Sequence, residues 1–192
     1  MNSPDLVHEY QATLSAVREW IEETLEETRD LAVPVSDLSL PRLEKVFPPD
    51  LLGRAKVVVV AEAVPLPPLS RMGFPEFARV ERMPAAGVTY KDTFFVNRRC
   101  RIESLYFHEL VHVLQWDRLG VDNFLVAYGT GLIQFGYRNS PLERMAYSLQ
   151  DKFNRKALPD DVVETVYQET DAVWDRVTAL LANGNRQRGV GG

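Results

Sequence analysis

Cysteine is almost absent from this sequence, because Cys100 is the single one among 192 residues. One thiol cannot form an intramolecular disulfide, so the chain is not a disulfide-stapled scaffold and depends on a hydrophobic core. A chain of this length can bury such a core, and its 45% hydrophobic composition is ordinary for a globular protein. We therefore expect one domain over residues 1–192.

Long apolar runs and basic clusters are also missing. The longest apolar run, around residues 57–60, is far shorter than the roughly 20 residues of a membrane-spanning helix, so we expect no membrane partner. The first residues show no signal-peptide pattern, and we expect a cytoplasmic protein. With a net charge of −5 and three arginines at 98–101 as the densest basic group, we expect no nucleic acid partner.

The first half of the chain carries the pattern of one helix followed by strands. Residues 3–30 repeat apolar side chains every three or four positions, which is typical of an amphipathic helix. Residues 56–61 form a continuous β-branched run, which predicts a strand covered on both faces. Further strands are predicted at 77–82 and 88–96, with a hairpin connection at 84–87.

Helical patterns dominate the second half of the chain. We expect helices at about 102–116, 123–135, 140–154 and 160–181, followed by a flexible tail at about 183–192. A helix, then strands, then helices is the order of an α+β domain, in which helices cover one side of a small antiparallel or mixed sheet. We expect the helix at 102–116 to pack against that sheet, with the other helices toward both ends of the chain.

The helix predicted at 102–116 contains the pattern His-Glu-x-x-His, formed by His108, Glu109 and His112. Residues four apart on a helix differ by about 40° of rotation, so the two imidazoles lie one above the other and can reach one metal ion. Glu109 projects at an adjacent angle, where it can contact a water on the metal rather than the metal itself. The spacing predicts a Zn²⁺ site in which Glu109 acts as the general base.

The surroundings of this pattern favour a metal over a pair of core histidines. Between Ser104 and Trp116 the helix is apolar almost all the way round, and such helices are buried. Burying three ionisable side chains together is costly unless a partner satisfies them, and a divalent cation satisfies all three at once. The alternative is that both histidines bond to the backbone while Glu109 pairs with Arg101 or Arg144.

A catalytic zinc site takes three protein ligands and leaves one position for water. The pattern with a third histidine six residues after the second fails here, because that position is Arg118. The best remaining candidate for the third ligand is Glu143. It also forms a capping-box pattern with Ser140, in which the glutamate folds back onto the start of its helix instead. The other acidic candidates are Asp122, Glu169 and Asp171.

These motifs resemble those of the gluzincin type of zincin metallopeptidases, in which a later helix supplies a glutamate ligand, often in a Glu-x-x-Ala setting. Glu143 and Ala146 are similar to that setting, and the resemblance covers about residues 94–150. It implies a zincin-like fold and a zinc metallopeptidase that hydrolyses a peptide or protein substrate. The implied metal ligands are His108, His112 and Glu143.

One position departs from the resemblance. Where some members carry an aspartate four residues after the ligand glutamate, this chain has Tyr147, which leaves the partner of His108 unassigned. A tyrosine near the metal can donate a hydrogen bond to a developing oxyanion, and we favour Tyr137 over Tyr128 and Tyr147 for this catalytic role. The alternatives to a peptidase are a zinc hydrolase of another amide or ester and an inactive binding protein that keeps the zincin frame.

The substitution Glu143→Ala separates the two roles that the sequence allows for Glu143. Loss of one of three protein donors should weaken zinc binding strongly, and this is the result that we expect. Loss of a capping residue alone would cost about 1 kcal/mol of stability and leave the zinc affinity nearly unchanged. Ser140→Ala is the matched control, because it weakens the cap in either case. Equal zinc affinities of the two variants in a chelator-competition titration would contradict the ligand role.

Overall fold

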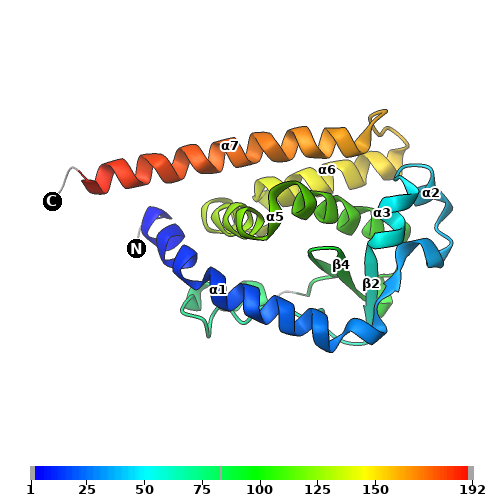
Figure 1. The fold of residues 1–192 in the computed structure, drawn as a ribbon, viewed down its shortest axis with the longest axis horizontal. Helices are drawn as coiled ribbons and strands as arrows, with labels where there is room; N and C mark the ends of the chain where they lie inside the picture. The colour runs from blue at the N-terminus through cyan, green and yellow to red at the C-terminus, as the bar shows by residue number, and fades with distance from the viewer. Residues whose placement is uncertain (1–2, 83, 190–192) are drawn as a thin grey trace.

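The computed structural model describes residues 3–82 and 84–189, with side chains described except at 3–12, 76, 79–80 and 183–189. Figure 1 shows how the helices and strands are arranged. The first half contains α1 (Ser3–Glu27), β1 (Val33–Pro34), α2 (Pro41–Glu44), α3 (Pro49–Arg54), β2 (Lys56–Val60) and α4 (Ala78–Glu81). The second half contains β3 (Gly87–Tyr90), β4 (Thr93–Asn97), α5 (Glu103–Phe135), α6 (Pro141–Arg155) and α7 (Val162–Gly189). Short 3-10 turns at Arg29–Leu31, Val35–Leu38, Pro75–Phe77, Arg98–Cys100 and Tyr137–Asn139 connect them.

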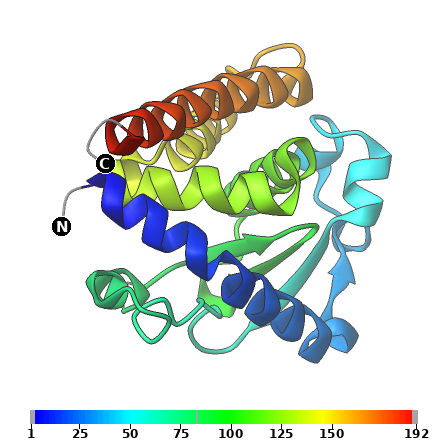
Figure 2. The ribbon, with the colours of Figure 1, turned by 60° about the vertical axis from the view of Figure 1, so that its left-hand side comes forward.

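A mixed sheet with the strand order β1-β2-β4-β3 lies against the helices. β2 and β4 run parallel, and the two outer pairs are antiparallel. Phe94, Phe95 and Val96 of β4 are fully buried, because both faces of this inner strand are covered. α5 packs on β3 and β4, while α6 and α7 lie on the other side of α5 (Figure 1). Figure 2 shows α1 crossing beside the second half of α5. The predicted α+β class with a small mixed sheet is confirmed.

The strand predicted at 77–82 is wrong. This segment starts as the 3-10 turn Pro75–Phe77 and continues as α4. Phe77 and Val80 are three positions apart in the sequence, a spacing that suits a helical turn, and Pro75 fixes φ at the start of the turn. The hairpin connection predicted at 84–87 therefore does not form.

The single strand predicted at 88–96 is a hairpin instead. β3 and β4 pair antiparallel with Tyr90 opposite Thr93, so Lys91 and Asp92 form a two-residue turn. Lys91 adopts a positive φ of 57°, which is typical of tight hairpin turns. The sequence hides this turn because it lacks the glycine or asparagine that usually marks one.

The helices predicted at 102–116 and 123–135 are the two halves of α5. They meet at Gly120, whose backbone is non-helical, with φ 71° and ψ 173°. Glycine adopts a positive φ readily because it has no Cβ. In the first half every residue from Ser104 to Trp116 is buried, which confirms the burial expected from the apolar composition of this helix.

The last helices start close to their predicted positions. The segment predicted as helix at 140–154 is α6, and α7 covers the helix predicted at 160–181. The backbone of α7 remains helical through Gly189, in the region where the sequence predicts a flexible tail at 183–192. Residues 190–192 lie outside the described residues. None of the helices in the described ranges combines the length and the apolar character that crossing a bilayer requires.

The second half of α5 approaches the start of α6 closely at Gly131. A Cβ added there would lie 2.6 Å from Ser140 Oγ and 3.1 Å from Pro141 Cδ. The serine hydroxyl can rotate away, but the proline ring cannot, so the two helices must separate to admit a methyl group. The glycine therefore permits the close contact that brings α6 to α5.

We expect Gly131→Ala to lower the free energy of unfolding by about 1–3 kcal/mol, which is the usual cost of overpacking a close contact. Gly53→Ala is the matched control, because a Cβ there meets nothing within 4 Å. In α3 that change should raise the stability by about 0.5 kcal/mol, since alanine favours a helix over glycine. Denaturant unfolding of both variants measures the difference, and equal stabilities would contradict the close contact.

Candidate metal site

Three of the residues predicted as metal ligands meet in the interior of the fold. His108 and His112 lie on successive turns of α5, and Glu143 faces them from the first turn of α6. The ligand atoms of these three side chains lie within 4.8 Å of one another. The two Nε2 atoms are 3.1 Å apart, and each lies 3.5 Å from an oxygen of Glu143. Two imidazoles and a carboxylate are donors that divalent transition metals accept, so these residues are able to hold a metal ion.

The charges within this cluster stabilise one another. Burial alone would raise the pKa of Glu143, yet the neighbouring His112 and His108 hold it below its usual range. Burial alone would lower the pKa of His112, but the Glu143 carboxylate raises it to about 9. The carboxylate is therefore ionised, and it favours positive charge at the point where the three side chains meet.

Two buried polar atoms of the cluster have no hydrogen-bond partner among the described residues. These are Glu143 Oε2 and His108 Nδ1. The contact between Glu143 Oε2 and His108 Nε2 is 3.5 Å long, which is beyond a normal hydrogen bond. Leaving a buried carboxylate oxygen without a partner is costly, and a metal ion at this point would remove that cost. The cluster therefore fits a metal by its chemistry as well as by its geometry.

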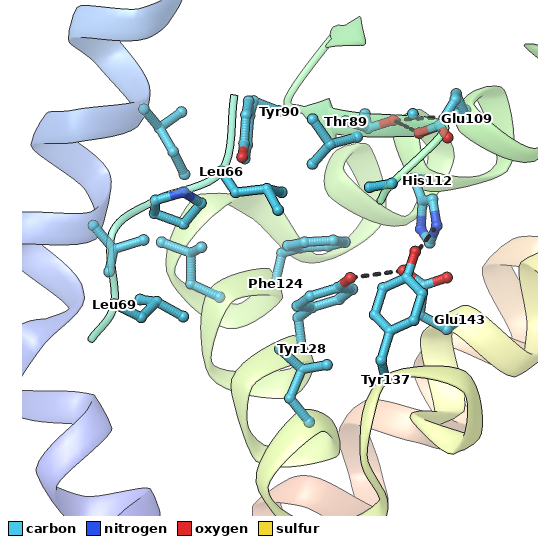
Figure 3. A pocket seen from close by; sticks show the side chains of 18 of the residues that line it. Leu66, Leu69, Thr89, Tyr90, Glu109, His112, Phe124, Tyr128, Tyr137 and Glu143 are labelled. Atoms are coloured by element: carbon cyan, nitrogen blue, oxygen red, sulfur yellow. Dashed lines mark hydrogen bonds and ion pairs between the residues drawn. The ribbon is translucent and has the colours of Figure 1, made fainter. Parts of the chain in front are cut away.

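The capping role is not adopted by Glu143 in this structure. Ser140 is the N-cap residue of α6, but its side chain makes no capping hydrogen bond. The Ser140 N–H donates to the carbonyls of Gly136 and Tyr137 rather than to the Glu143 carboxylate. That carboxylate instead accepts a hydrogen bond of 2.6 Å from the Tyr128 hydroxyl (Figure 3). Tyr128 thus holds Glu143 toward the two histidines.

Gln115 orients His112 and was not identified by the sequence patterns. Its amide oxygen lies 2.8 Å from His112 Nδ1, and its amide nitrogen donates to the Leu142 carbonyl over 3.1 Å. Because the carbonyl can only accept, the amide oxygen must face the imidazole, so the neutral form of His112 carries its proton on Nδ1. In that form the Nε2 lone pair can bind a metal. A glutamine three residues after the second histidine is the signal that could have predicted this contact.

His108 is held by packing instead. The Tyr147 ring lies against its imidazole, with the ring centroids 4.5 Å apart. This tyrosine stands four residues after Glu143, and no described residue bonds to His108 Nδ1. The partner that holds His108 from outside the ligand cluster, which the sequence leaves unassigned, is therefore the aromatic ring of Tyr147.

Glu109 lies beside the cluster but outside the group of converging ligand atoms. Its carboxylate accepts a hydrogen bond of 2.7 Å from the Thr89 hydroxyl on β3. Burial raises the pKa of Glu109, and the two histidines oppose this shift in part. Neither arginine considered for a core ion pair serves as its partner, since Arg101 Nε donates to the Tyr106 hydroxyl and Arg144 is exposed.

Gly87 makes room for the Glu109 side chain. A Cβ at this position would lie 2.3 Å from Glu109 Oε1, far inside van der Waals contact. The neighbouring Thr89 is fixed in turn, because its carbonyl accepts a hydrogen bond of 3.2 Å from Trp116 Nε1. The edge strand β3 thus leaves space for the Glu109 carboxylate of α5 and binds it through Thr89.

The three candidate tyrosines occupy different positions. The Tyr128 hydroxyl bonds to Glu143, and the Tyr147 ring packs on His108. Besides burial, a hydrogen bond to Tyr147 is among the causes that raise the pKa of Tyr137. Tyr137 lines the same pocket beside Glu143 (Figure 3). Burial and the Glu143 charge raise the pKa of Tyr137, so its hydroxyl keeps its proton and can donate a hydrogen bond. The catalytic role of Tyr137 stays a prediction.

The other acidic candidates lie away from the cluster. Asp122 forms an ion pair with Arg18, and Asp171 accepts from Arg118 Nε over 2.7 Å. Glu169 is exposed on α7. Glu143 is therefore the acidic residue, among these candidates, that the fold brings to the two histidines.

The site opens into a pocket with a cavity volume of about 150 Å³. His108, Glu109, His112 and Glu143 form its polar end, and apolar side chains form the rest.

In comparisons with protein-family models, with curated proteins and with solved structures, nothing matches this chain. The functional argument therefore depends on the chemistry of the site itself.

Gln115→Leu should weaken zinc binding about 10–100-fold, which is the usual effect of removing a residue that orients a metal ligand. The variant loses the acceptor of His112 Nδ1 and the bond to the Leu142 carbonyl. Thr170→Val is the control, because Thr170 is equally buried and lies near Met145, away from the ligand atoms. Zinc titration of the folded variants measures the effect. An unchanged affinity in Gln115→Leu would contradict the orienting role.

Proposed function

We propose that this protein is a zinc-dependent hydrolase, and specifically a metallopeptidase of the zincin type. The observation that carries the proposal is the arrangement of four polar side chains in one buried pocket. His108, His112 and Glu143 converge on a single point, while the Glu109 carboxylate lines the same pocket without joining them. A purely structural metal site has no need of such an additional base.

Zinc held by the three ligands would lower the pKa of a bound water to about 7 and polarise a substrate carbonyl. Glu109 is the residue that takes the proton of the attacking water and delivers it to the leaving amine. Its carboxylate is buried in the same pocket as the three ligands, within reach of a water bound there. Thr89 binds Oε2 and so fixes the direction in which the carboxylate acts.

Tyr137 is the residue that we assign to oxyanion stabilisation. It comes from the turn before α6 and lines the pocket with Glu109 and Glu143. Its hydroxyl keeps its proton, so it can donate a hydrogen bond to the oxygen of the polarised carbonyl. Such a bond becomes stronger as negative charge develops, which is the condition for lowering the barrier.

The edge strand β3 offers a means of holding an extended peptide. It is the last strand of the sheet, paired with β4 alone among the described strands. The Thr89 carbonyl is already bonded to Trp116, and the remaining backbone groups of the outer edge of β3 can pair with a peptide backbone by strand addition. Thr89 on this strand contacts Glu109, so a peptide aligned there would pass close to the base.

A zinc hydrolase of a small amide or ester is the second candidate. The limited cavity volume of about 150 Å³ favours it, because a pocket of this volume suits a small substrate. The residues and their roles are the same as those of the peptidase. Screening small amides and esters beside peptide libraries distinguishes the two functions.

Protein purified without chelator should contain about one zinc per chain, and Glu109→Gln should keep that zinc. Hydrolysis of a peptide library should fall at least about 100-fold in this variant, because a general base contributes roughly 10²–10⁴ to the rate. Elemental analysis and mass spectrometry of the cleavage products measure the two quantities. Glu103→Gln, the same change at the start of the same helix, is the control and should retain activity.

Each alternative outcome of this experiment has a definite meaning. Loss of zinc together with activity would make Glu109 a ligand rather than a base. Full activity in Glu109→Gln would exclude Glu109 as the general base and contradict the proposed mechanism. If the protein contains no metal and does not bind zinc in a titration, His108 and His112 are core histidines and the proposed function is contradicted.

A further inference from the structure

We propose that the pocket beside the metal site recognises an uncharged apolar group about the size of a phenyl ring. That this group belongs to the substrate, next to the bond that is cleaved, rests on the proposed function. The binding chemistry of the pocket is independent of it. The argument depends on the side chains that line the pocket, on their charges and on the volume that they enclose.

Apolar side chains from three separate parts of the chain close the pocket away from the ligands. Leu66 and Leu69 come from the segment after β2, and Phe124 and Leu125 come from the second half of α5 (Figure 3). α1 adds Ile21 on the remaining side. Burying an apolar group against these side chains lowers the free energy of binding, whereas a polar group would find few hydrogen-bond partners there.

An aromatic wall leads from this apolar end to the metal site. It consists of Trp116, Phe124 and Tyr128, whose rings stack in series with centroid separations of 3.8 Å and 5.5 Å. The Tyr128 hydroxyl at its end donates to Glu143. A flat group lying on this wall is therefore adjacent to the ligand cluster, and aromatic rings favour such stacked contacts.

The pocket offers no free charge to a charged group. No lysine or arginine is found among its described lining residues, so no side chain away from the metal site would neutralise a substrate carboxylate. Glu81 is the acidic residue away from the metal site, and both of its oxygens bond to Ser70, over 2.6 Å and 2.7 Å. Recognition of a charged peptide terminus in the apolar part of the pocket is therefore disfavoured, and we expect an internal or blocked bond to be cleaved.

The volume limits the size of the group. An apolar cavity of about 150 Å³ lined by aliphatic and aromatic side chains holds one benzene molecule. The pocket in this protein has a cavity volume of about 150 Å³ in total, which includes the polar end formed by His108, Glu109, His112 and Glu143. One phenylalanine or leucine side chain is thus a group whose size suits the apolar part of the pocket.

The first test measures benzene binding to the whole protein by saturation-transfer NMR, without zinc and with zinc. Benzene should bind in both states. Ala85 lines the pocket, so Ala85→Trp should fill it and weaken benzene binding at least about tenfold, the effect expected when an apolar binding surface is lost. Ala86→Trp adds the same bulk at a neighbouring residue that does not line the pocket, and should bind benzene normally. If Ala85→Trp does not fold, Leu66→Gln provides the same comparison.

The second test measures cleavage of a peptide library by the zinc-loaded protein. Phenylalanine or leucine at one position beside the cleaved bond should be preferred at least about tenfold over charged residues. Acetylated and amidated peptides should be cleaved as fast as free ones. Ala85→Trp should remove the preference, whereas Ala86→Trp should keep it.

The two tests separate the failure of this inference from the failure of the proposed function. Absence of benzene binding, or cleavage that ignores the neighbouring side chain, would overturn the apolar recognition while zinc-dependent hydrolysis stands. Benzene binding that Ala85→Trp abolishes, in a protein without any hydrolytic activity, would support the pocket and overturn the hydrolase. Faster cleavage of peptides with free termini would overturn the absence of charge recognition.

Discussion

The contact on which the site depends is the burial of one carboxylate between two imidazoles. Glu143 is nearly inaccessible to solvent, and an ionised carboxylate in that environment needs compensating charge or strong hydrogen bonds. His108 and His112 supply the first, and the Tyr128 hydroxyl supplies the second. α5 and α6 must therefore stay in register at this point, and Gly131 allows them to approach closely enough.

Polar contacts outside the ligand set tie the sheet and the two helices to one another. Gln115 connects His112 on α5 with the backbone of α6 at Leu142. On the opposite side, Thr89 connects β3 with the carboxylate of Glu109. Because each of these groups is buried, each bond would be costly to leave unmade, and together they fix the direction of the side chains at the site.

The parts of the site that the sequence predicted are those that depend on local spacing. His108 and His112 are four residues apart on one helix, so their convergence follows from helix geometry alone. The choice between two roles for Glu143 required the contact between α5 and α6, which no local pattern contains. The hairpin at Lys91 and the helical turn at 77–82 were missed for a related reason, since short segments satisfy more than one periodicity. The local spacing of Gln115 and His112 allows their contact, but the bond from Gln115 to Leu142 that fixes the amide is tertiary and has no local pattern.

The non-helical backbone at Gly120 divides α5 into two parts that contribute different side chains to the site. The part before it carries both imidazoles and Glu109, while the part after it carries Phe124 and Tyr128, which line the pocket. The direction of the second part therefore sets both where the Tyr128 hydroxyl meets Glu143 and where Phe124 faces the pocket. A side chain at position 120 would be strained at a φ of 71°, so a substitution there would disturb the pocket and the support of Glu143 together.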